Sequence, residues 1–219
     1  MPGTAPTEYA DTIVRAGFAV AGQLCISIQR VIVHQAIYAA VQSELLARVS
    51  ALKVGDPMDE ATDVGTLIDS PACDRVSAEV EAACSAGATL LAGGRRLGQS
   101  GYAPTVLADL PQDCRLLTEE AFAPLILLMP CTDLQHAVAI ANATPYGLNA
   151  GIYTQSLDEA LTAARDLQFG SVIINDVPSF RSDLMPYGGR KQSGLGREGV
   201  RFAMEEMTEL KVVCFRHPL

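Results

Sequence analysis

The feature that most constrains this chain is an alternation of short apolar runs with amphipathic segments along most of its length. Runs rich in β-branched residues are typical of strands, and apolar residues at helical spacing are typical of helices. Strands that alternate with helices predict a three-layer α/β fold with a mostly parallel sheet and helices on both faces. The expected strands are 30–34, 89–92, 125–129, 150–154, 171–175 and 210–215, with buried runs at 125–129 and 171–175.

The composition narrows the classes of function. At 219 residues and 49% apolar content, the chain can bury one substantial core. Its net charge of −9, with scattered basic residues, provides no basic surface for nucleic acid or for an anionic membrane. No apolar run approaches the roughly 18 residues that span a bilayer, and the N-terminus does not resemble a signal peptide. We therefore expect a cytoplasmic protein with neither partner.

Six cysteines are present, and none forms a C-x-x-C pair. Reduced thiols and no metal site are the expectation. Five of the six are interpreted as small core residues. Cys25 differs, because it follows the end of an expected helix near Gly22, where the backbone can approach a substrate and the next amides can face an oxyanion. Cys25 is therefore a candidate nucleophile, although a buried structural role remains the alternative.

The segment 177–199 is rich in glycine, proline and serine and is too long for an ordinary connection. It predicts a functional loop. Within it, GLGREG at 194–199 formally spells G-x-G-x-x-G, but it follows a polar run and leaves only 20 residues after it. A dinucleotide-binding fingerprint needs a strand before it and a βαβ unit around it, so this interpretation is rejected.

Three motifs resemble those of the aldehyde dehydrogenase superfamily and occur in that family's order. They are FAVAGQLCISIQR at 18–30, EEAFAP at 119–124 and PYGGRKQSGLGRE at 186–198. The resemblance covers the chain from about residue 8 to 215. It implies the fold of the catalytic domain of that family, with an unmatched tail at 1–7, the domain at 8–209 and an oligomerisation strand and tail at 210–219.

The resemblance implies a mechanism centred on Cys25. The thiolate attacks an aldehyde, the hemithioacetal loses hydride to NAD or NADP, and water hydrolyses the thioester that remains. Glu120 and Phe122 match the positions that hold the nicotinamide ribose and flank the ring, although an exposed acid beside a core aromatic is an equal alternative. Ala123 departs from the usual glycine of this motif, which puts the cofactor contact in question.

Further roles follow from the same resemblance. Tyr187 matches an aromatic of the substrate tunnel, Glu198 a carboxylate that relays protons during thioester hydrolysis, and Asn175 a residue of the tunnel wall. The alternatives are a partly buried aromatic and a solvated charge near a helix N-terminus. Phe180 and Arg181 are expected to set substrate preference, with Arg181 pairing with an anionic aldehyde. An ion pair between Arg181 and Asp183 is the structural alternative.

Full-length members of the family carry a Rossmann-type cofactor domain, an oxyanion-hole asparagine and a general-base glutamate ahead of the nucleophile, and none of these is found in this sequence. The chain is expected to begin within the helix before the nucleophile and to bind cofactor weakly alone. Three hypotheses remain: the catalytic domain of an aldehyde dehydrogenase; a cofactor-independent esterase or thioesterase using Cys25, with Glu198, His34, His136 or His217 assisting water; and a non-catalytic module. The strand at 210–215 is expected to form at least a homodimer.

Overall fold

A computed structural model of the chain describes residues 1–3 and 5–216. At its centre is a four-stranded sheet with the order β1-β6-β5-β2. Strands β1 and β5 run parallel to β6, and β2 is antiparallel to β5. The four strands are β1 (Arg30–His34), β2 (Thr89–Ala92), β5 (Thr105–Ala108) and β6 (Leu125–Cys131).

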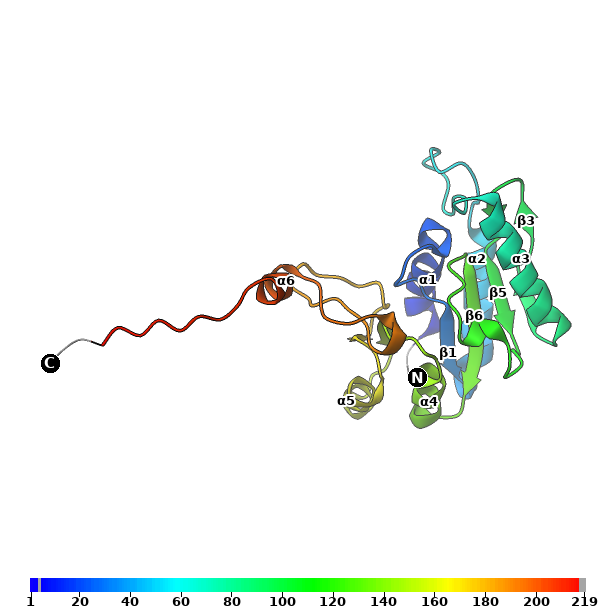
Figure 1. Cartoon of the computed structure of the whole chain (residues 1–219). Coiled ribbons are helices and arrows are strands. Elements are labelled where there is room, and N and C mark those ends of the chain that lie inside the picture. The colour runs from blue at the N-terminus through cyan, green and yellow to red at the C-terminus, as the bar shows by residue number, and fades with distance from the viewer. Residues whose placement is uncertain (4, 217–219) are drawn as a thin grey trace.

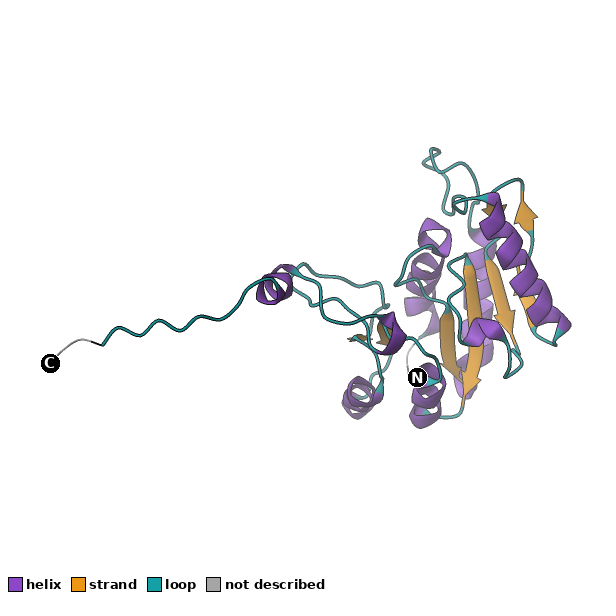
Figure 2. Ribbon diagram, in the orientation of Figure 1, coloured by secondary structure: helices purple, strands orange, loops and turns teal. Residues whose placement is uncertain are grey.

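Helices lie on both faces of this sheet (Figure 2). The sequence of β6 requires this arrangement, because residues Leu125 to Leu128 are all buried although successive side chains of a strand point to opposite faces. The predicted α/β fold with a mostly parallel sheet is confirmed. The helices of this layer structure are α1 (Pro6–Phe18), α2 (Tyr38–Ala51), α3 (Ser70–Ser85) and α4 (Leu134–Asn142).

A second, smaller unit follows α4. Strands β7 (Asn149–Ile152) and β8 (Ser171–Ile174) pair in parallel and are joined by α5 (Leu157–Asp166). They form a sheet of their own. The strand predicted at 171–175 is formed, but the prediction that it is buried was wrong, since Ile173 is its one buried residue and Ile174 is 38% exposed. In the described chain β8 has a hydrogen-bonded neighbour on one side only, which leaves part of its surface open.

The sequence analysis missed β5, although all four of its residues are buried. The run TVLA is short and lies between a proline and an aspartate, so its pattern alone does not separate a strand from a loop. A small hairpin of β3 (Arg96–Leu97) and β4 (Gly101–Tyr102) was also missed. The predicted strand boundaries differ from the observed ones by up to two residues, as expected of patterns without capping signals.

The residues after helix α6 (Val200–Glu206) extend away from the rest of the molecule (Figure 1). After this short helix, the described residues to Arg216 have no regular secondary structure and are exposed. We call residues 207–216 the C-terminal arm. The strand predicted at 210–215 is not formed within the described chain, because no other segment of it pairs with the arm. The rest of the predicted tail, 217–219, lies outside the described residues.

No helix in the described part of the chain combines the length and the apolar composition needed to cross a bilayer.

Candidate active site

The nucleophile candidate lies on a strained turn that follows α1. Val20, Ala21 and Gly22 all have left-handed backbone angles, with φ of 51°, 55° and 72°. A positive φ is unusual for a β-branched residue such as Val20, and strain of this kind concentrates at functional sites. The turn reverses the chain between the buried end of α1 and strand β1 and leaves Cys25 exposed. The buried structural role considered as the alternative for Cys25 was therefore wrong.

Gly22 permits a close approach of two backbone segments. A Cβ atom at this position would lie 2.0 Å from the carbonyl oxygen of Ala123, so no larger residue fits without a shift. The observed close neighbour of Gly22 is the backbone of Ala123, and the expected approach of this backbone to a substrate stays a prediction. The contact brings the cysteine-bearing motif against the EEAFAP motif, about 100 positions later in the sequence.

Two glutamines fix the segment that carries Cys25. Gln23 donates through Nε2 to the carbonyl oxygens of Val20 (3.0 Å) and Thr66 (3.2 Å). Its Oε1 accepts a hydrogen bond of 2.8 Å from the backbone N–H of Ile68. Both N–H groups and the oxygen of the Gln23 amide therefore form hydrogen bonds that hold the turn before the cysteine.

Gln29 links the same segment to the EEAFAP motif. Its Nε2 donates to the carbonyl oxygens of Leu116 and Glu119, both at 2.8 Å, and its Oε1 accepts from the N–H of Ala121 at 2.9 Å. These bonds secure the backbone on both sides of Glu120. Sequence reasoning missed both glutamines; their signal was a polar side chain on either side of the cysteine within an otherwise apolar run.

Cys25 and Glu120 line one cavity of about 310 Å³. Partial desolvation raises the pKa of the Glu120 carboxyl, and the Arg75 guanidinium offsets part of this rise. Arg75 also donates to the carbonyl oxygen of Ala121 at 2.8 Å, which anchors the residue after Glu120. Pro178, from the loop at 177–199, forms another part of the wall, as do residues around Tyr146 and Ser193. The structure thus places a thiol and a carboxyl group with a raised pKa around one space.

Tyr187 contacts the sulfur directly. Its hydroxyl oxygen lies 2.7 Å from Sγ of Cys25, and the backbones of Tyr187 and Glu198 pair through two hydrogen bonds of 3.0 and 2.6 Å. Burial raises the pKa of the Tyr187 hydroxyl, and the contact with Cys25 raises it further. The phenol therefore stays protonated at neutral pH and is able to donate to the sulfur.

Arg181 stacks on Tyr187, with the guanidinium carbon 4.3 Å from the centre of the ring. This is a cation–π contact. The sulfur of Cys25 therefore contacts the phenol of Tyr187, and this phenol in turn contacts the positively charged guanidinium of Arg181. Among the described residues no ion pair joins Arg181 to Asp183, so the structural alternative considered for Arg181 does not describe the observed arrangement.

Four other residues predicted for the site do not line this cavity. Phe122 is 43% exposed and Phe180 is 47% exposed, and neither lines the cavity that holds Cys25. Asn175 is exposed, and its Oδ1 accepts a hydrogen bond of 2.8 Å from the N–H of Thr154. Glu198 is also exposed and reaches the site through its backbone pairing with Tyr187.

The loop at 177–199 is held by close backbone contacts. A Cβ on Gly170 would lie 1.7 Å from the carbonyl oxygen of Gly188, so Gly188 of the PYGG segment packs directly against the residue before β8. The G-x-G-x-x-G segment at 194–199 lies between a 3₁₀ turn (Lys191–Ser193) and α6. No strand precedes it, so the rejection of a dinucleotide fingerprint is confirmed.

The histidines considered for a hydrolase do not surround the cavity. Nδ1 of His34 accepts from the N–H of Ala36, and His136 contacts Thr132, and neither ring lines the cavity of Cys25. His217 lies outside the described residues. Within the described ranges no group of three or more histidine, cysteine or acidic side chains is placed to hold a metal ion.

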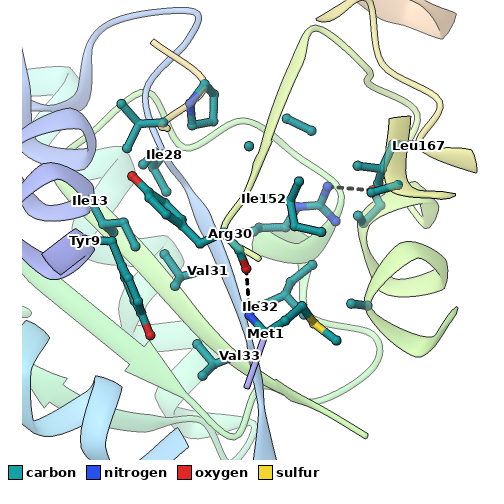
Figure 3. A pocket seen from close by; sticks show the side chains of 18 of the residues that line it. Met1, Tyr9, Ile13, Ile28, Arg30, Val31, Ile32, Val33, Ile152 and Leu167 are labelled. Carbon is teal, nitrogen blue, oxygen red and sulfur yellow. Dashed lines mark hydrogen bonds between the residues drawn. The ribbon is translucent and has the colours of Figure 1, made fainter. Parts of the chain in front are cut away.

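A second cavity, of about 280 Å³, is lined in part by residues 27–33, which follow Cys25 in the sequence (Figure 3). Apolar side chains of α1 and β1, such as Ile13 and Val31, face Ile152 and Leu167 across it. Arg30 lies between the two cavities and donates to the carbonyl oxygens of Ile140 and Ala141 at the end of α4. Cys25 does not line this second space, which fills the junction between the four-stranded sheet and the β7–β8 unit.

Residues 5–213 match the Aldehyde dehydrogenase family. The chain is 45% identical over 204 residues to aspartate-semialdehyde dehydrogenase 1 of Pseudomonas canavaninivorans, covering 93% of this chain and 43% of that protein. It is 40% identical over 206 residues to 3-sulfolactaldehyde dehydrogenase of Priestia megaterium, covering 94% and 43%.

Solved structures agree with these matches. The fold superposes with a TM-score of 0.91 on aldehyde dehydrogenase 21 of Physcomitrella patens in complex with its product succinate, at 40% identity, covering 95% of this chain and 44% of that one. It superposes with a TM-score of 0.90 on an NADP complex of glyceraldehyde-3-phosphate dehydrogenase of Methanocaldococcus jannaschii, at 39% identity, covering 95% and 45%. The chain spans less than half the length of each of these relatives.

Proposed function

The chain belongs to the aldehyde dehydrogenase family, and we propose that it is the nucleophile-bearing catalytic part of an NAD(P)-dependent enzyme that oxidises a small anionic aldehyde. The observation that carries the proposal is the surroundings of Cys25: an exposed sulfur, 2.7 Å from a phenol, on the wall of a cavity that Glu120 also lines. The homologues are NAD(P)-dependent aldehyde dehydrogenases, which agrees with this chemistry.

The residues for the cofactor fit in part. The Glu120 carboxylate, anchored on both sides by Gln29, reaches the cavity of Cys25 and is able to accept hydrogen bonds from the two ribose hydroxyls of NAD or NADP. Phe122 has a solvent-accessible ring able to pack on the nicotinamide. When bound, the cofactor supplies a hydride acceptor. The other contacts needed to offset the entropy lost on cofactor binding would come from the part of a full-length relative that this chain does not span.

The residues of this chain perform the covalent steps. The Cys25 thiolate attacks the aldehyde carbon, and a new C–S bond forms as the carbonyl π electrons move to oxygen. After oxidation the acyl group remains on the sulfur as a thioester. Water then attacks the acyl carbon, the C–S bond breaks, and the thiolate returns. Glu198, whose backbone pairs with that of Tyr187, is the proposed relay for the proton that leaves the water.

The loop after β8 supports a preference for anionic substrates. Arg181 lies on the ring of Tyr187, one side chain from the sulfur, and places a permanent positive charge near the mouth of the site. We propose that it attracts the carboxylate, sulfonate or phosphonate of the aldehyde, with Phe180 and Asn175 along the same entrance. Two relatives named for aspartate semialdehyde and sulfolactaldehyde, and a third solved with succinate, agree with this class.

The test uses the whole chain and a matched mutant. The pure protein is mixed with succinate semialdehyde and either NAD or NADP, and reduced cofactor is followed by absorbance. Formation of NADH or NADPH that is lost in Cys25→Ala supports the proposal. If the chain is inactive alone, purified catalytically dead full-length homologue that carries its own cofactor domain is added. Failure to form the acid under both conditions contradicts the proposal.

A second candidate function is favoured by one observation. Cys25 and Glu120 share a cavity, and the raised pKa of Glu120 suits a general base that accepts a proton from water. Hydrolysis of an ester through an acyl-Cys25 intermediate needs no cofactor. We expect p-nitrophenyl acetate turnover to depend on Cys25, and Glu120→Gln to remove the rise of that turnover with pH. Turnover that persists in Cys25→Ala would rule this candidate out.

The C-terminal arm supports a proposal about assembly. Leu210, Val212 and Phe215 are at least 92% exposed, so the arm offers apolar side chains and unpaired backbone groups to a partner. We propose that it adds as a strand to a second copy and forms a homo-oligomer. Light scattering of the chain and of a truncation after Glu206 tests this. A dimer that becomes monomeric on truncation is expected, and a monomer in both contradicts it.

A further inference from the structure

The contact between Cys25 and Tyr187 gives the Tyr187 hydroxyl a role of its own. An aromatic residue that only lines a substrate tunnel would not need this hydroxyl. We propose that the Tyr187 hydroxyl is a catalytic group of the site, which donates a hydrogen bond to the Cys25 thiolate and holds the sulfur ready for attack. This inference rests on the proposed function, since it concerns the same nucleophile. It differs from a lining role because it depends on one oxygen atom, not on the aromatic ring.

The distance supports a hydrogen bond. The oxygen and sulfur atoms are 2.7 Å apart, so the two groups are in direct contact. Burial raises the pKa of the Tyr187 hydroxyl, so the phenol keeps its proton and is able to donate a hydrogen bond to the sulfur. Hydrogen bonds to an ionised acceptor are about twice as strong as neutral ones.

The surroundings of Tyr187 hold the hydroxyl in place. Both its backbone N–H and its backbone C=O form hydrogen bonds with the backbone of Glu198, which fixes the segment from which the ring projects. Arg181 covers a face of the ring at 4.3 Å. A ring secured by its backbone and by a stacked guanidinium presents its oxygen to the sulfur with little loss of side-chain entropy on binding.

The charged and titratable groups around the pair agree with this assignment. Arg181, Glu198 and Cys25 are the groups that act on the Tyr187 hydroxyl. Arg181 is positive and favours negative charge on the pair, whereas Glu198 opposes it. Burial also disfavours a phenolate at this position, so Tyr187 is the donor of the pair and the sulfur is the acceptor.

The phenol also has a use after the attack. As the C–S bond forms, the sulfur loses its negative charge and the carbonyl oxygen, two bonds away, gains it. The Tyr187 hydroxyl can then transfer its hydrogen bond from the sulfur to this carbonyl oxygen, while its own O–H bond remains intact. Donors aimed at an oxygen that becomes charged are a major source of catalysis in acyl transfer.

The test compares Tyr187→Phe with the wild-type chain. The rate of Cys25 alkylation by iodoacetamide is measured from pH 5 to 10, with the modified residue identified by peptide mass spectrometry. Loss of the hydroxyl should slow alkylation near neutral pH about tenfold and move the pH–rate curve to higher pH. Because the ring remains, a purely structural role of Tyr187 predicts an unchanged curve.

Tyr38→Phe is the matched control, since its hydroxyl contacts the carbonyl oxygen of Leu128, away from the sulfur. It should leave the curve unchanged. A superimposable curve for Tyr187→Phe overturns the inference while leaving the nucleophile in place. By contrast, Cys25 that resists alkylation at every pH in the wild type overturns the proposed function itself, so the two failures are distinguishable.

Discussion

The cysteine-bearing body and the C-terminal arm use similar residues in opposite ways. Leu127 in β6 is fully buried, whereas Leu210 in the arm is fully exposed, and each lies in a run that reads as a strand. The body also places its exposed cysteine, Cys25, against a phenol and a cavity, while Cys214 is exposed on the arm. The comparison shows that an apolar run of the described chain forms a strand where a neighbouring strand pairs with it, and that the arm has no such neighbour.

The largest difference should appear in stability. Leu127→Ala leaves a void in a fully packed strand and should reduce the free energy of unfolding by about 2–5 kcal/mol. Leu210→Ala deletes the same atoms from a solvated segment and should change it by less than about 0.5 kcal/mol. Urea unfolding of both variants, at a concentration that keeps the chain monomeric, measures the difference. Similar losses would mean that the arm packs on the body in solution.

Gly22 gives the second test, because it joins two motifs of the body. Gly22→Ala places a methyl group against the carbonyl of Ala123 and should cost about 1–3 kcal/mol, with slower alkylation of Cys25. Gly98→Ala is a suitable control, since Gly98 has a similar φ of 65° but open space around it. The amount by which Gly22→Ala lowers the free energy of unfolding beyond Gly98→Ala measures the cost of the clash with Ala123. Equal losses would remove the argument that this contact positions the cysteine.

The charge at Arg181 should have a smaller effect. Arg181→Ala should lower the ratio of Cys25 alkylation rates for iodoacetate over iodoacetamide about fivefold, since one reagent is anionic and the other neutral. Arg181→Lys keeps the charge and should recover most of the ratio. Rapid kinetics at low salt, followed by mass spectrometry, provides the values. A ratio unaffected by Arg181→Ala would contradict a role in attracting anionic substrates.

Much of the body was predictable from the sequence. The strand at 30–34 and the buried run that begins at Leu125 carry strong local patterns, and the structure forms both as the neighbouring strands β1 and β6. The β5 strand was missed because four buried residues between turn-forming residues carry no periodicity. The strand expected at 210–215 depends on a partner that the sequence of one chain does not contain.

The site was predictable in its motifs but not in its contacts. The order of motifs identified Cys25, Glu120 and Tyr187, and the structure places Tyr187 against the sulfur of Cys25 and places Glu120 on the cavity that Cys25 lines. The anchoring by Gln23 and Gln29 was not foreseen, because it depends on backbone carbonyls from distant segments. The stacking of Arg181 on Tyr187 likewise depends on the path of a loop, which local pattern does not specify.

The central claim is that the body, not mere exposure, makes one cysteine a nucleophile. Both Cys25 and Cys214 are exposed, so they form an internal comparison. The most direct measurement is the acylation of each by p-nitrophenyl acetate at neutral pH, quenched rapidly and mapped by peptide mass spectrometry. We predict that Cys25 is acylated at least about tenfold faster than Cys214. Equal rates at the two cysteines, or faster reaction on the arm, would contradict the account.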